Sequence, residues 1–214
     1  VVEVKMPKEL ECRPLRESME KPDFSMDPSG MGGTFDFDKF GRTELLHVLY
    51  LALDDYRKAH GGLPKMQDGG AAAEYVKYVH AAKARTGLET EIDEELVKKF
   101  ARTAGAVLIP FVSIFGGIVG QEVAKAVSQK HHPVYQFQYL DAFEILMDYE
   151  GAGGEEFVGS GSRYDSQIGV LGRSLQSKMG DLKYFMVGCG ALGCELFKNF
   201  AMMGIACGPG GMVT

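Results

Sequence analysis

A glycine pattern between an apolar run and an amphipathic segment constrains the fold of this chain more than any other feature. Residues 183–187 are typical of a strand, and residues 192–203 have the apolar periodicity of a helix. Gly188, Gly190 and Gly193 stand at this junction with the spacing G-x-G-x-x-G. Since a second strand-like run follows the helix, the pattern predicts a β-α-β unit.

Each glycine of this turn has a separate physical role. Gly188 allows a tight turn out of the strand, Gly190 lets a phosphate approach the backbone because it has no Cβ atom, and Gly193 lets helix and strand pack closely. The amides of Gly190, Ala191 and Leu192 then point out of the helix N-terminus, where the dipole favours an anion. The pattern predicts a phosphate site, against the alternative of a turn that binds nothing. It does not choose between NAD, FAD and ATP, because that choice depends on an acidic residue at the end of the next strand.

The overall composition is that of a globular protein. Of 214 residues, 45% are hydrophobic and 24% are charged, which excludes a disordered tail and a disulfide-dense miniprotein. The formal net charge of −6 argues against binding to nucleic acid or to an anionic membrane surface.

One uncharged stretch, residues 103–121, approaches the length needed to span a bilayer. It contains Pro110 and several glycines, and Glu122 and Lys125 continue its helical pattern with charged side chains. We therefore predict a buried helix of a soluble core that runs to about residue 130. Its predicted core positions are Phe111, Ile114, Phe115 and Ile118.

The rest of the periodicity indicates mainly helix. Apolar stripes predict packed helices over residues 42–60 and 71–85, and Asp93 is the expected N-cap of another. The side chains expected to be buried between the first two helices are Leu49, Leu53, Val76 and Val79. Residues 134–140 alternate and are rich in β-formers, so they predict a strand. Residues 151–161 have the composition of an exposed linker.

The cysteines and histidines do not suggest a metal site. Cys12, Cys189, Cys194 and Cys207 contain no C-x-x-C pair, and we expect reduced, mostly buried thiols that fill space and do not catalyse. The adjacent His131 and His132 have no acidic or cysteine partner at ligand spacing. His47 is expected to be a semi-buried histidine with satisfied hydrogen bonds.

Several segments resemble, in colinear order, eukaryotic ubiquitin-activating enzymes. Residues 184–214 are similar to the start of the active adenylation half, and residues 163–167 to the helix that introduces that half. The stretch that begins with residues 115–123 and ends with residues 138–142 resembles the end of the inactive adenylation half. The pieces that resemble the four-helix bundle inserted in that half are residues 4–7, 22–24 and 45–47.

The resemblance implies an α/β fold with excess helix. It places a four-helix-bundle region at residues 1–91 and the C-terminal part of the inactive half at residues 92–150. A linker at residues 151–161 then precedes residues 162–214, the truncated start of the active, Rossmann-like half. Ser166 stands where bacterial relatives have an arginine that reaches a partner's ATP, which implies a half that receives such an arginine.

The same resemblance implies the function of a parent enzyme. That enzyme adenylates the C-terminus of ubiquitin with ATP and Mg²⁺, forms a ubiquitin thioester and serves ubiquitin-conjugating enzymes in cytoplasm and nucleus. Gly188, Gly190, Ala191 and Gly193 match its nucleotide loop. No catalytic residue or metal ligand is expected within these 214 residues, so the chain alone is expected to be inactive. Two alternatives stay open: a non-catalytic scaffold segment and part of a dinucleotide-binding oxidoreductase.

Overall fold

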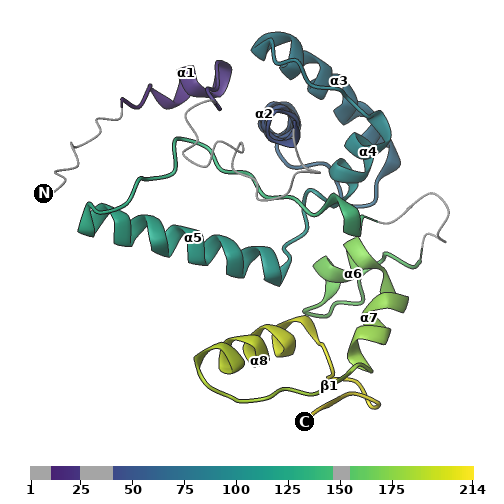
Figure 1. Cartoon of the computed structure of the whole chain (residues 1–214). Helices are drawn as coiled ribbons and strands as arrows, with labels where there is room; N and C mark the ends of the chain where they lie inside the picture. Colours follow the sequence, from purple (N-terminus) through teal and green to yellow (C-terminus); the bar gives the residue numbers. More distant parts are fainter. Residues whose placement is uncertain (1–10, 25–40, 147–154) are drawn as a thin grey trace, which may run out of the picture.

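The computed structural model describes residues 11–24, 41–146 and 155–214, and these are mainly helical (Figure 1). The first part of the chain holds α1 (Leu15–Glu20), α2 (Arg42–His60), α3 (Gly69–Thr86) and α4 (Glu94–Thr103). The long helix α5 (Ile109–Ser128) and the short 3₁₀ helix η2 (Phe143–Ile145) follow. The last part holds α6 (Asp165–Leu171), α7 (Arg173–Gly180), β1 (Lys183–Tyr184), α8 (Ala191–Met203) and β2 (Met212–Val213).

The hydrophobic core lies among α2, α3 and α4. Leu49, Leu53, Val76 and Val79 are all buried, which confirms the predicted packing of α2 on α3. Their common cluster continues into α4 through Val97 and Ala101. Asp93 is confirmed as an N-cap, because its carboxylate accepts hydrogen bonds from the amides at the start of α4. Helix α4 therefore begins where its local signal indicates.

Helix α5 does not belong to this core, so its predicted burial is wrong. None of its residues is buried, and Ile114 and Phe115 are exposed. Phe111 and Phe115 face Tyr50 and Phe100 of the bundle across an apolar cavity of about 230 Å³. The helix extends beyond the bundle in Figure 1, so periodicity identified the helix but not what covers its apolar face. Among the described residues no helix is long and apolar enough to cross a membrane.

The predicted strand at residues 134–140 is also wrong. This segment runs irregularly past α1 and α2, with Gln136 in a left-handed conformation at φ 58°. The alternation still has a structural effect, because Phe137 and Tyr139 stack with their ring planes 9° apart. A strand also needs a neighbouring backbone with which to pair, and this segment is held by side-chain contacts instead.

The C-terminal part is a small β-α-β unit supported by α6 and α7 (Figure 1). β1 and β2 form a parallel pair in which Lys183 is opposite Met212 and Tyr184 is opposite Val213. The strand predicted at residues 183–187 is thus shorter, although the amide of Met186 still bonds to the carbonyl of Thr214. The described residues establish this one unit and not two complete Rossmann-like halves.

Candidate nucleotide-binding loop

The glycine-rich turn connects β1 to α8 with the local geometry that its sequence predicts. Gly188 has φ +90°, a conformation that side chains rarely adopt. A Cβ atom on Gly193 would lie 2.6 Å from the carbonyl oxygen of Gly188, so only glycine permits the helix to approach the turn this closely. The backbone, not the side chains, therefore defines the shape of this loop.

The N-terminus of α8 is open to a ligand. Gly190 is the N-cap and offers no side-chain hydrogen bond to the first turn. The amide of Cys194 donates to the carbonyl of Gly190 at 2.9 Å, while the amides that precede it belong to the turn where a helix has no acceptors of its own. A Cβ atom on Gly190 would meet no heavy atom within 4 Å. Such a helix end can hold one anionic group by backbone hydrogen bonds and by the helix dipole.

The opposite end of α8 is fixed by donors from α6, α7 and the turn before α6. The guanidinium of Arg163 donates to the carbonyl of Ala201 at 2.5 Å. The side-chain amides of Gln167 and Gln176 donate to the carbonyl of Met203 at 2.9 and 3.0 Å. These contacts satisfy carbonyl groups that every helix leaves unpaired at its C-terminus. As a result α8 is anchored at one end while its glycine-rich end stays accessible.

Asp165 orders the approach to α6. Its carboxylate accepts hydrogen bonds from the amides of Ser160, Gly161 and Ser162. These hydrogen bonds, that of Ser160 above all, lower the pKa of Asp165. Because Asp165 sits in the first turn of α6, its negative charge also favours the helix.

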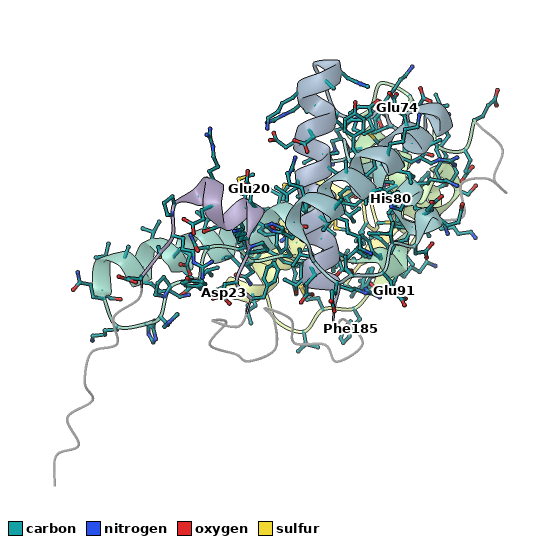
Figure 2. The ribbon with its side chains drawn as sticks, turned by 90° about the horizontal axis from the view of Figure 1, so that it is seen from above. Glu20, Asp23, Glu74, His80, Glu91 and Phe185 are labelled. Atoms are coloured by element: carbon teal, nitrogen blue, oxygen red, sulfur yellow. The ribbon has the colours of Figure 1, made fainter. Side chains whose placement is uncertain are left out.

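The side chains around the loop are apolar and exposed. Phe185, which Figure 2 labels, is 78% exposed, and Val187 and Leu192 are 86% and 82% exposed. On the neighbouring side, the hydroxyl of Ser113 in α5 donates to the side-chain oxygen of Asn199 in α8 at 2.6 Å. The loop therefore lies on an open apolar surface and not in a closed pocket.

The cysteines of this region are not buried, which corrects the expectation of buried thiols. Cys12, Cys189, Cys194 and Cys207 are all free and exposed. The sulfur atoms of Cys189 and Cys194 lie 3.7 Å apart, a proximity that the sequence pattern did not lead us to expect. The sequence feature that could have indicated this proximity is the C-x₄-C spacing across a tight turn into a helix. The hydrogen bond to Cys194 raises the pKa of the Cys189 thiol, because it favours the protonated form, and repulsion from a neighbouring Cys194 thiolate acts in the same direction.

No group of three or more potential metal ligands occurs among residues 11–24, 41–146 and 155–214. His132 uses Nδ1 in a hydrogen-bonding contact with the carbonyl of Pro133 at 2.8 Å and does not join a ligand cluster with His131. Within the described residues, α8 thus begins at an uncapped end, and no cluster of potential metal ligands lies beside it.

The fold and the loop define a helical bundle joined to a β-α-β unit with a glycine-rich turn. A family model described as the ubiquitin-activating enzyme E1 four-helix bundle matches residues 6–83. Over the whole chain, the sequence is 42% identical to ubiquitin-activating enzyme E1 1 of Arabidopsis thaliana and 43% identical to ubiquitin-activating enzyme E1 2 of Triticum aestivum. It is 40% identical to ubiquitin-like modifier-activating enzyme 1 of Homo sapiens, again over the whole chain.

This chain matches a segment of ubiquitin-activating enzyme E1 proteins. It covers 19% of the Arabidopsis protein and 20% of the wheat and human proteins, so it spans about a fifth of the length of these relatives. The bundle match lies inside the predicted region 1–91.

Proposed function

We propose that this chain provides the phosphate-binding loop of an ATP-dependent ubiquitin-activating enzyme. The observation that carries the proposal is the uncapped N-terminus of α8 at Gly190, within a sequence that matches these enzymes over its whole length. The amides of Gly190 and Ala191 would hold a phosphate group of ATP. Gly188 and Gly193 would hold the backbone in the required shape.

In the proposed reaction, the parent enzyme activates the C-terminal carboxylate of ubiquitin as an adenylate and passes it to a cysteine as a thioester. Conjugating enzymes would then receive the ubiquitin, in the cytoplasm and the nucleus. Mg²⁺ bound with ATP would neutralise charge that develops on the phosphates. This chain would contribute binding and orientation of the nucleotide, while the groups that complete catalysis would come from other parts of the parent.

The 214 residues alone would not carry out adenylation. A single phosphate held by one helix end gives a dissociation constant of roughly 1 mM, or about 4 kcal/mol of binding. Stabilising charge at the reacting phosphate needs positioned cations, and removing one such group typically reduces the rate by roughly 10² or more. Pyrophosphate exchange with ubiquitin, ATP and Mg²⁺ should therefore be at background for this chain. Turnover by the chain alone would contradict this division of labour.

Replacing Gly190 by valine in the parent enzyme tests the loop directly. Gly190 has φ −78° and ψ −158°, a conformation open to other residues, and a Cβ atom there would meet nothing. Gly190→Val should therefore leave folding intact and reduce ATP-dependent pyrophosphate exchange at least tenfold by obstructing the phosphate. Gly62→Val is the matched control, because a Cβ atom on Gly62 would also meet no heavy atom within 4 Å. Gly62 lies between α2 and α3, far in sequence from the loop at Gly190.

The result separates the proposal from its alternatives. Unchanged pyrophosphate exchange in Gly190→Val would favour the scaffold interpretation and contradict a phosphate role for the loop. Tight binding of NADH with no effect of ATP, measured by nicotinamide fluorescence, would instead favour a dinucleotide-binding oxidoreductase.

A further inference from the structure

Two thiols meet across the proposed phosphate loop. Cys189 lies between Gly188 and Gly190, and Cys194 lies in the first turns of α8. Their sulfur atoms are 3.7 Å apart, and the Cys194 thiol also lies 3.5 Å from the carbonyl oxygen of Cys189. Both residues are exposed, so small reagents can reach both sulfurs.

The surrounding backbone permits these sulfurs to approach further. A disulfide bond is about 2.05 Å long, so the pair has to close by roughly 1.6 Å. Cys189 is flanked by Gly188 and Gly190, and a Cβ atom on either glycine would meet no heavy atom within 4 Å. Because this side of the pair sits in an unobstructed glycine turn, a small rearrangement there can supply the movement while α8 beyond its first residue stays in place.

We propose that Cys189 and Cys194 form a reversible disulfide that switches the phosphate loop off under oxidising conditions. The oxidant is a hydroperoxide. A thiol of the pair loses its proton, the thiolate attacks the peroxide oxygen and the O–O bond breaks, which leaves a sulfenic acid. The departing hydroxide or alkoxide takes up a proton and leaves as water or an alcohol. The second thiol then displaces the hydroxyl group from the sulfenic sulfur, so that the S–S bond forms and water leaves. The two thiols are oxidised by two electrons and the peroxide is reduced by two, and thiol exchange with a dithiol reverses the reaction.

The ring closed by this bond would contain the whole anion site. The residues between the two cysteines are Gly190, Ala191, Leu192 and Gly193. Pulling Cys189 toward α8 changes the direction of the amides at Gly190 and Ala191, which are the groups proposed to hold the phosphate. This consequence rests on the proposed function, whereas formation of the disulfide does not.

The other two cysteines lack this arrangement and serve as internal references. Cys207 is exposed, but its thiol contacts the carbonyl oxygen of Ile205 at 3.4 Å. Cys12 is exposed in the segment before α1. If exposure alone decided reactivity, all four thiols would oxidise similarly. If proximity decides it, only Cys189 and Cys194 form an intramolecular bond.

The first experiment measures the disulfide in the full chain. After treatment with one equivalent of hydrogen peroxide, free thiols are alkylated and the chain is digested with trypsin. The peptide of residues 184–198 should be lighter by two hydrogen atoms and carry no alkyl group, and reduction with dithiothreitol should restore two alkylation sites. Cys12 and Cys207 should remain alkylated. A peptide 184–198 that is alkylated twice, or that carries only sulfenic or higher acids, would overturn the proposal.

Variants and a functional readout complete the test. Cys12→Ser/Cys207→Ser should still form the bond, and Cys189→Ser and Cys194→Ser should not. In the parent enzyme, peroxide should reduce ATP-dependent pyrophosphate exchange at least tenfold in a dithiothreitol-reversible way, and Cys189→Ser should remove most of that sensitivity. If the disulfide forms while exchange is unchanged, the switch is refuted and the disulfide stands. If the disulfide is absent while Gly190→Val still abolishes exchange, the inference fails and the proposed function stands.

Discussion

The Nδ1 atom of His47 lies 2.8 Å from the hydroxyl oxygen of Tyr139, 92 residues later in the chain. Its Nε2 atom lies 2.8 Å from the carbonyl oxygen of Met19. Because a carbonyl only accepts, Nε2 carries the proton, and Nδ1 accepts from the tyrosine. His47 is 1% exposed, so one neutral histidine connects α1, α2 and the segment before η2. This confirms the expectation of a satisfied histidine and shows deeper burial than expected.

The stability of the chain should therefore depend on the charge of His47. Burial lowers the pKa of His47 below its ordinary value of 6.5, so the unfolded chain binds this proton more readily than the folded chain. The stability that the neutral His47 ring contributes is fully present above about pH 6.5, and it is lost as the pH falls through the pKa of His47 in the folded chain. In urea unfolding, His47→Gln should have a lower free energy of unfolding than the wild type at pH 7.5. Between pH 7.5 and 5.5, the free energy of unfolding should fall less in this variant than in the wild type.

His131 supplies the matched control for this experiment, because it is an exposed histidine. His131→Gln should leave the free energy of unfolding at pH 7.5 within about 0.5 kcal/mol of the wild type, as surface substitutions usually do. Equal slopes of stability against pH in the wild type and in His47→Gln would show that the buried ring does not govern the acid response.

The cap of α4 offers a test of local structure. The carboxylate of Asp93 accepts from the amides of Glu95 and Leu96 at 3.0 and 3.3 Å. Asp93→Ala should lower the free energy of unfolding by about 1 kcal/mol, because two amides lose their acceptor. Asp93→Asn keeps a capping oxygen and should recover most of this loss. Equal losses in the two variants would show that charge and not capping explains the effect.

Gly193 tests whether the shape of the loop depends on close backbone approach. A Cβ atom there would lie 2.6 Å from the Gly188 carbonyl, and backbone cannot yield as a flexible side chain can. Gly193→Ala should destabilise the β-α-β unit by about 1–3 kcal/mol, the usual cost of overpacking. The measurement is amide hydrogen exchange. In Gly193→Ala, exchange in α8 should be faster than in the wild type, while exchange in α2 should stay the same.

Gly190→Ala provides the comparison, since a Cβ atom at Gly190 meets nothing within 4 Å. This variant should leave hydrogen exchange in α8 close to the wild type. A similar loss of protection in both variants would contradict the distinct roles given to the two glycines.

Substitutions in α5 test the finding that this helix is not part of the core. Val123 is 61% exposed, whereas Val97 in α4 is fully buried. In the 214-residue chain, Val123→Asp should change the free energy of unfolding by less than about 0.5 kcal/mol, as surface substitutions usually do. Val97→Asp should largely prevent folding, because it buries a charge without a partner. Severe destabilisation by Val123→Asp would show that α5 is packed against the chain after all.

The sequence alone determined the features that depend on neighbouring residues. Asp93 predicts a cap because its carboxylate reaches amides two and three positions ahead, and Gly188 predicts a positive φ because the turn follows it at once. The pattern from residue 183 to residue 203 likewise predicts its turn and helix, since glycine spacing and helical periodicity are both local. Binding of ATP at this loop remains a prediction.

Only the tertiary structure decided which surfaces meet. The apolar pattern of α5 predicts a helix but cannot tell whether other residues of this chain bury it, and here none of its residues is buried. The alternation at residues 134–140 places Phe137 and Tyr139 on one side, yet a strand also requires a paired backbone, and the contacts to α1 and α2 took its place. Cys189 and Cys194 are close because a turn of defined conformation directs both thiols to one place. Periodicity and composition describe each segment by itself, whereas burial and pairing depend on segments that are distant in the chain.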